Sequence, residues 1–259
     1  GTIRWRFENG AADSSGYWWS LPVIAETWDG YLNDINGFHV RPAHAAAAIE
    51  SAKSGPVTEG NVGGGTAMNC FEYKCGTGTS SRVTNAAGQE YTVGVLVQAN
   101  FGRRDELIVA GVPVGKHLRN DMVFSGDSTD DTETGSIIIV VGTNAPLMPH
   151  QLKRLTRRAA LGLSRTGSIA GNGSGDIFIA FSTANERASQ ASTGVSIDTF
   201  ANENIGPLFR ATVQATEEAI TNALIAGRDM TGNRGNTVKG IDHGRLTAIL
   251  RDYNRLEED

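Results

Sequence analysis

The residues best placed for chemistry are Gly135 and Ser136, where an acidic loop meets an apolar strand. Residues 126–134 read GDSTDDTET, and residues 136–141 read SIIIVV. A serine that begins a buried strand is held in place by the sheet, while a loop ending in glycine can bend into strained backbone geometry. This arrangement suits self-cleavage, in which the Ser136 hydroxyl attacks the Gly135 carbonyl and the chain splits. A Gly-Ser pair is also typical of an ordinary turn.

Cleavage at this bond would also provide the base that a serine nucleophile needs. The new α-amine of Ser136 has a reference pKa of about 7.7–8.0, so part of it is neutral near pH 7 and can take the proton of its own hydroxyl. No histidine is then required. The spacing of the five histidines gives no support for a Ser-His-Asp triad.

Other kinds of site find little support. The chain has no Gly-x-x-x-x-Gly-Lys-Ser/Thr pattern and therefore no P-loop. The glycines of 171–175 follow a predicted helix and precede a predicted strand, which reverses the order of the dinucleotide-binding fingerprint. His39 and His44 form the only close histidine pair, and no His-Glu-x-x-His is present. We expect neither a metal nor a cofactor.

Length, composition and charge narrow the class of protein. The 259 residues lie near the upper limit for one hydrophobic core, and 39% hydrophobic with 20% charged residues exclude a disordered or membrane-embedded chain. A formal net charge of −5 argues against a nucleic-acid partner. The longest apolar runs are too short to span a membrane. Cys70 and Cys75 flank a strand-like run, and we expect them to be buried or half-buried free thiols.

The elements that must position Ser136 are strands and helices with distinct patterns. Apolar or β-branched runs predict strands at 67–74, 91–98, 136–141 and 177–182. Alanine-rich or amphipathic stretches predict helices at 42–53, 149–163, 206–226 and 244–256, and the acidic stretch 126–134 predicts a surface loop. Buried strands with intervening helices indicate an α/β sandwich of sheet covered by helix layers.

Six ordered blocks carry a family resemblance. They read AETWDGYLNDINGF (25–38), NVGGGT (61–66), GVLVQANFG (94–102), GSIIIVVGTNAP (135–146) and NGSGDIFIAFSTAN (172–185), and the sixth is 207–227. Together they resemble the L-aminopeptidase/D-esterases and beta-peptidyl aminopeptidases, the DmpA-like autoproteolytic serine aminopeptidases. The resemblance implies a four-layer α-β-β-α sandwich like that of ornithine acetyltransferases. It also implies oligomers, often tetramers of cleaved heterodimers.

The resemblance assigns roles to five residues. Ser136 corresponds to the nucleophile and to the first residue of the second chain. Ser174 and Asp176 correspond to a hydroxyl and a carboxylate beside the nucleophile, although better-studied members have Glu at the latter position. Tyr31 and Asn100 correspond to the pair that stabilises the oxyanion, a task for which a phenol and an amide are suitable donors.

Three further residues are candidates for substrate binding. Glu26 and Asp29 lie close to Tyr31 in sequence, and a carboxylate suits the ammonium group of a substrate. Asn61 matches the family loop, where its role is either substrate contact or backbone shape. Without the resemblance, each proposed site residue is compatible with a purely structural role, such as packing, capping or a turn.

The expected function is that of a self-processing N-terminal-serine aminopeptidase acting on a small peptide, amide or ester. One catalytic domain over 1–259 would be cut into 1–135 and 136–259. Family members carry a further segment ahead of the first block, so the 1–135 piece is expected to lack its N-terminal part. Two alternatives remain: an ornithine acetyltransferase-like acyl transferase, which would use Thr where Ser136 stands, or a non-catalytic binding protein. The choice among L-, D- and β-amino-acid substrates stays open.

Overall fold

A computed structural model describes residues 1–11, 16, 18–119, 123, 135–188 and 194–256. The predicted surface loop at 126–134 lies outside the described residues. By its internal contacts the chain divides into two compact units. The smaller consists of Gly1–Glu26 and Asp34–Val57, and the larger of Thr27–Asn33 and Thr58–Asp259.

The smaller unit contains helices α1 (Thr2–Arg6) and α2 (Pro42–Glu50). Pro42 occupies the first turn of α2, where its missing N–H costs no intrahelical hydrogen bond. The Trp5 indole N–H donates to Glu50 Oε1 over 2.8 Å and so ties α1 to the end of α2. The predicted helix at 42–53 is confirmed, although it ends at Glu50.

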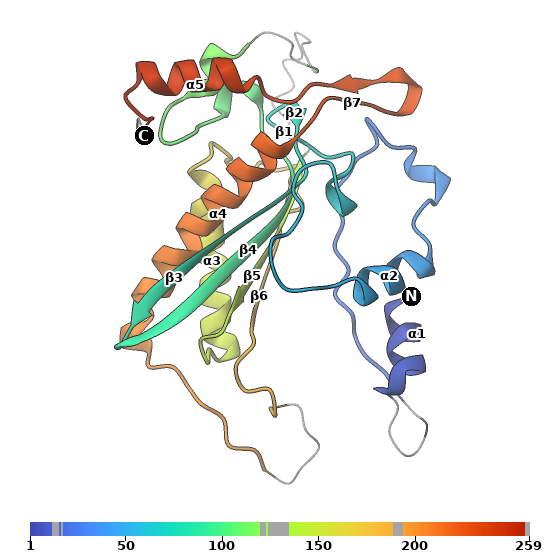
Figure 1. The fold of residues 1–259 in the computed structure, drawn as a ribbon, viewed down its shortest axis with the longest axis vertical. Coiled ribbons are helices and arrows are strands. Elements are labelled where there is room, and N and C mark those ends of the chain that lie inside the picture. Colours follow the sequence, from blue (N-terminus) through green and yellow to red (C-terminus); the bar gives the residue numbers. More distant parts are fainter. Residues whose placement is uncertain (12–15, 17, 120–122, 124–134, 189–193, 257–259) are drawn as a thin grey trace. The chain divides into compact units, whose positions relative to one another are not determined.

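A four-stranded sheet forms the centre of the larger unit (Figure 1). Its strands are β3 (Thr77–Ala86), β4 (Gln89–Asn100), β5 (Ser136–Thr143) and β6 (Ile177–Ser182), in that order across the sheet. β4 pairs antiparallel with β3 and β5, while β6 runs parallel to β5. Ala87 and Gly88 join β3 to β4 with positive φ angles of 56° and 81°, as a two-residue hairpin turn requires.

Two helices cover one face of this sheet, with α4 (Gly206–Ala226) over β3 and β4 and α3 (Pro149–Ser164) over β6 (Figure 1). The face of β4 that they cover is fully apolar: Tyr91, Val93, Val95, Val97 and Ala99 alternate with more exposed residues. Strand and helix approach closely at Gly78, where a Cβ would lie 2.0 Å from the Ala219 carbonyl oxygen. The predictions for α3, α4, β4, β5 and β6 are confirmed.

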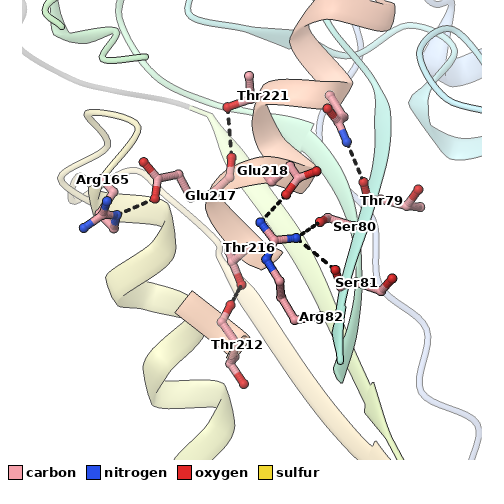
Figure 2. A network of polar contacts seen from close by, with 11 residues as sticks. Thr79, Ser80, Ser81, Arg82, Arg165, Thr212, Thr216, Glu217, Glu218 and Thr221 are labelled. Carbon is pink, nitrogen blue, oxygen red and sulfur yellow. Dashed lines mark hydrogen bonds and ion pairs between the residues drawn. The ribbon is translucent and has the colours of Figure 1, made fainter. Parts of the chain in front are cut away.

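Polar contacts also fasten the edge strand β3 to α4 (Figure 2). The Arg82 guanidinium pairs with Glu218 and donates to the Ser81 carbonyl oxygen over 2.9 Å. Beside it, Arg165 at the end of α3 pairs with Glu217. These groups line a pocket of about 380 Å³ that contains none of the predicted site residues.

The segment predicted as one strand at 67–74 is instead a hairpin, so that prediction is wrong. Strands β1 (Asn69–Cys70) and β2 (Tyr73–Lys74) are joined by Phe71 and Glu72, whose φ angles are 51° and 62°. The reversal brings the Cα atoms of Cys70 and Cys75 to 5.3 Å, within the range for a disulfide. The expectation of free thiols is therefore also wrong, because the two cysteines form a disulfide bond.

Replacing both cysteines of this disulfide with alanine should lower the free energy of unfolding. Closing a loop this short removes enough entropy from the unfolded chain to contribute about 2 kcal/mol. Urea unfolding of the Cys70→Ala/Cys75→Ala double variant and of wild type measures the difference. Two reactive thiols in denatured, unreduced wild type would contradict the assignment.

The remaining elements of the larger unit are short. Strands β7 (Met230–Thr231) and β8 (Thr237–Val238) form a small hairpin. Helix α5 (His243–Asp252) begins after Asp242, whose carboxylate accepts from the Arg245 N–H over 3.0 Å, and it ends earlier than the predicted 244–256. Single helical turns lie at Phe7–Ala11, Ile35–Gly37, Gly63–Gly65, Arg104–Glu106, Val114–His117, Asn202–Asn204 and Asn233–Gly235. No helix of the described chain has the length and apolar character needed to span a bilayer.

Candidate active site

Ser136 is the first residue of β5 and lies directly opposite Asn100, the last residue of β4. Residues paired in this way across an antiparallel ladder project from the same face of the sheet, with Cβ atoms about 4.5–5.5 Å apart. The face is the one that α3 and α4 leave uncovered, because Asn100 alternates with the buried Ala99. The sheet therefore places a hydroxyl and a carboxamide side by side.

A turn before β6 reaches the Ser136 side chain. The Gly175 N–H donates to Ser136 Oγ over 2.9 Å. The parallel pairing of Ile177 with Ile138 places this turn at the beginning of β5. Because Oγ accepts this hydrogen bond, the oxygen is held in place, and the hydroxyl proton of Ser136 stays available for transfer to a base.

Asp176 contacts both the turn and the nucleophile strand. Its Oδ1 accepts from the Ile137 N–H over 3.1 Å and from the Ser174 hydroxyl. Its Oδ2 is buried and has no hydrogen-bond partner within the described residues. A buried acceptor without a donor is uncommon, and it marks a position that a further donor would satisfy. The structure thus brings together Ser136, Ser174 and Asp176.

Gly135 is tightly enclosed, a feature that the sequence did not indicate. A Cβ on this residue would lie 2.5 Å from both the Asn100 carbonyl oxygen and the Phe101 Cα. Any side chain would therefore push the peptide bond between Gly135 and Ser136 away from the end of β4. The residue before the nucleophile must be glycine to stay in this position.

Asn100 is held at both ends of its amide group. Its Nδ2 donates to the Trp28 carbonyl oxygen over 2.8 Å, and its Oδ1 accepts from the Asn69 N–H over 3.0 Å. The residue is 7% exposed. An amide nitrogen has two hydrogens, and the second has no acceptor within the described residues. Such a fixed amide can donate to an anion that forms beside Ser136.

Tyr31 and Asp29 lie on the segment that Asn100 contacts through Trp28. Tyr31 packs against the small cluster of Leu32, Ala67 and Val238. The Asp29 carboxylate accepts from Asn33 Nδ2, with both oxygens within 3.2 Å. Glu26 is exposed and belongs to the smaller unit.

Asn61 forms a reciprocal pair with the backbone after α4. Its Nδ2 donates to the Arg228 carbonyl oxygen over 2.9 Å, and its Oδ1 accepts from the Arg228 N–H over 3.0 Å. Both ends of the amide are therefore engaged in joining the 61–66 loop to the C-terminal end of α4.

The burial of one lysine, Lys74, was not predicted from the sequence. Lys74 is fully buried, and burial lowers its pKa from the usual 10.5 to about 7. The available signal was a lysine beside a cysteine in a strand-like run, which also fits an exposed strand residue.

Comparison with known proteins places this chain in a family. The model of Peptidase family S58 matches residues 1–238. The beta-peptidyl aminopeptidase BapA of Sphingosinicella microcystinivorans is 53% identical over 248 residues, 92% of this chain and 63% of that protein. The enzyme of the same name from Sphingosinicella xenopeptidilytica is 47% identical over 240 residues, 89% of this chain and 60% of that protein. The chain thus spans less than two thirds of the length of these curated relatives.

A solved structure supports the same relationship. The L-aminopeptidase D-Ala-esterase/amidase of Ochrobactrum anthropi is 46% identical and superposes with a TM-score of 0.89, covering 99% of this chain and 70% of that one. That protein is described as a prototype for the serine aminopeptidases and as a variant of the Ntn hydrolase fold. The expected fold class is confirmed, and the described residues contribute to it the four-stranded sheet with α3 and α4 packed on one face.

Proposed function

Because this chain belongs to peptidase family S58, we propose that it is a self-processing aminopeptidase whose nucleophile is an N-terminal Ser136. The observation that carries the proposal is the hydrogen bond from the Gly175 N–H to Ser136 Oγ at the first residue of β5. It presents the hydroxyl next to a closely packed Gly135 and a fixed Asn100 amide. The same hydroxyl serves two reactions in sequence.

The first reaction is self-cleavage. Ser136 Oγ attacks the Gly135 carbonyl carbon, and the bond from that carbon to the Ser136 nitrogen breaks. The acyl group passes to Oγ as an ester, and the hydroxyl proton passes to the departing amine. Water then hydrolyses the ester, which leaves a carboxylate on Gly135 and a free α-amine on Ser136.

The second reaction hydrolyses a substrate that has a free amino terminus. The neutral Ser136 amine takes the proton of its own hydroxyl, and Oγ attacks the substrate carbonyl carbon. Asn100 Nδ2 and the Tyr31 hydroxyl donate to the oxyanion. The leaving group departs with the proton, and water hydrolyses the ester on Ser136. The family and the names of the relatives favour hydrolysis over acyl transfer to ornithine.

Asp176 is proposed to hold the new amine. In the uncut chain its buried Oδ2 has no donor within the described residues. Cleavage converts an amide N–H one residue from Ile137, which Asp176 already binds, into an ammonium with three hydrogens. Ser174 donates to the other carboxylate oxygen and keeps the group oriented.

The proposed substrates are short peptides, amides or esters, with β-amino-acid peptides first because two relatives carry that activity in their names. Asp29, and Glu26 as a second candidate, would attract the substrate ammonium. Hydrolysis of matched L-amino-acid, D-alanine and β-amino-acid amides tests the proposal. No hydrolysis of any of the three by cleaved, folded protein would contradict it. We also propose that cleaved copies, each consisting of 1–135 and 136–259, assemble into a homo-oligomer, as the family resemblance implies.

The rate of hydrolysis should rise with pH through the pKa of the Ser136 amine, because only the neutral amine accepts a proton. If the site leaves the pKa of this amine at its reference value, the increase in rate is centred at about pH 7.7–8.0. A carboxylate beside the amine favours its protonated form, so Asp176→Asn should move the rise to lower pH. Profiles of kcat/KM against pH for both proteins provide the measurement.

Five single His→Gln variants are the controls for this profile. A histidine base predicts a rise near pH 6.5 that vanishes in one of them. Loss of activity in any one folded, cleaved variant would show that the amine is not the base.

A further inference from the structure

Among the described residues, the amine of Lys74 bonds only to backbone carbonyls. Its Nζ donates to Cys75 over 2.7 Å, to Met68 over 2.8 Å and to Gly65 over 3.3 Å. None of the ion pairs formed by the described residues includes Lys74. An ammonium has three donors, which matches three carbonyl acceptors. Burying a lysine is costly, so a side chain with 0% exposure and no carboxylate calls for an explanation beyond packing.

One of these carbonyls leads directly to the candidate active site. The Met68 C=O and the Asn69 N–H belong to the same planar peptide unit. Lys74 binds its oxygen, and its N–H donates to Asn100 Oδ1 over 3.0 Å. A continuous series of hydrogen bonds therefore runs from Lys74 through one peptide to the side-chain amide of Asn100.

We propose that Lys74 is a positioning residue that orients and polarises the Asn100 amide through the Met68–Asn69 peptide. The proposal rests on the proposed function, in which Asn100 Nδ2 donates to the oxyanion. A cation at the carbonyl oxygen strengthens the N–H of the same peptide as a donor. That N–H in turn draws charge toward Asn100 Oδ1, and Nδ2 becomes a stronger donor to an oxyanion beside Ser136.

The link does not depend on one protonation state. A neutral amine retains two hydrogens, enough for the two shorter bonds to Cys75 and Met68. The Met68 oxygen also accepts from the Cys75 N–H over 3.1 Å. Among the described residues, Lys74 provides the one side-chain donor to this carbonyl.

The hairpin that contains Lys74 has two other supports. Fully buried Arg104 donates from Nε to the Phe71 carbonyl oxygen and from Nη2 to the Glu72 carbonyl oxygen, each over 2.8 Å. The Cys70–Cys75 disulfide closes the hairpin at its base. Within the described residues, neither the Arg104 side chain nor the disulfide sulfurs bond to the Met68–Asn69 peptide. Arg104 therefore provides a matched control, a second buried cation that contacts the same hairpin without this link to Asn100.

The test compares Lys74→Met with Arg104→Met in the whole chain after cleavage. Lys74→Gln and Arg104→Lys form a milder pair in case the first variants do not fold. Steady-state kinetics on a β-amino-acid anilide gives kcat and KM separately. The ¹⁵N and ¹H resonances of the Asn100 side-chain amide, assigned by their loss in Asn100→Asp, report the amide independently of activity.

Replacing Lys74 should lower kcat by about 10- to 100-fold with KM changed less than about twofold, because the donor acts on the transition state. It should also shift the Asn100 amide resonances. The Arg104 variants should lose thermal stability with much smaller changes in both. Equal effects from the two sites, or unchanged resonances in the Lys74 variants, would overturn the proposal. An inactive wild type would overturn the proposed function, and the resonances would still decide whether Lys74 acts on Asn100.

Discussion

The 259-residue chain, once purified, is expected to consist of two pieces, of 135 and 124 residues, with the second beginning Ser-Ile-Ile-Ile. The expectation follows from the oriented Ser136 hydroxyl and from the enclosure of Gly135 against the end of β4. Ser136→Ala should remain one chain of full mass and have no hydrolytic activity, because it lacks both the attacking oxygen and the new terminus. Intact-mass measurement and N-terminal sequencing decide the outcome.

Two variants sharpen this test. Gly135→Ala should cleave much more slowly, since its Cβ would lie 2.5 Å from the Asn100 carbonyl oxygen and displace the scissile peptide. Ser168→Ala is a matched control, because Gly167 and Ser168 form another Gly-Ser pair away from the start of β5. It should cleave like wild type. A wild-type protein that is folded yet uncut would contradict the proposed mechanism at its first step.

Replacing Asn100 with alanine should lower turnover by about 10²–10³-fold, the usual effect of removing one preorganised oxyanion donor. kcat is measured on protein that is already cleaved, so that slower self-cleavage of a variant is not mistaken for slower turnover of substrate. Asn100→Asp is a useful second variant, since it keeps the acceptor for the Asn69 N–H and loses the donor. Tyr31→Phe tests the other proposed donor with the removal of a single hydroxyl.

Gln98 provides the control on the same strand. It precedes Asn100 by two residues, projects from the same face of β4 and pairs with Ile138 instead of Ser136. Gln98→Ala removes a donor to Thr27 Oγ1 (3.0 Å) and no group opposite Ser136, so it should lower turnover much less than Asn100→Ala. Any general loosening of the strand would affect both variants. Wild-type turnover in Asn100→Ala and Tyr31→Phe would assign both residues to structural roles.

The elements with an apolar face were predictable because the spacing of apolar residues along the sequence indicates which face is buried. Strands β4, β5 and β6 and helices α3 and α4 all carry such a pattern. Strand β3 does not, because it reads TGTSSRVTNA and lies at the edge of the sheet. Its closest approach to α4 is at Gly78, where the helix backbone leaves no room for a larger side chain. Hydrophobicity cannot reveal a contact that depends on the absence of a side chain.

The site was predictable only in part, for a reason of sequence distance. Ser174 and Asp176 were assigned to the site by the family resemblance. In the structure they lie near Ser136 because two adjacent parallel strands begin together. The contacts that hold Asn100 join residues 31 and 72 positions apart in the chain. Lys74 contributes through a hairpin whose two turn residues, Phe71 and Glu72, are not typical of positive φ. No local pattern specifies such contacts.

The register of the sheet has a consequence for the mature protein. β4 and β5 lie on opposite sides of the Gly135–Ser136 bond, yet they pair continuously from Val93 with Thr143 to Asn100 with Ser136. Once cut, the two pieces would share a single core with no covalent connection, since the disulfide joins two residues of the first piece. The uncut chain folds as one molecule, whereas the cut pieces can regain the sheet only by a bimolecular encounter that slows with dilution. Maturation would thus make folding a one-way process, in which the structure is reached before cleavage and is difficult to recover after it is lost.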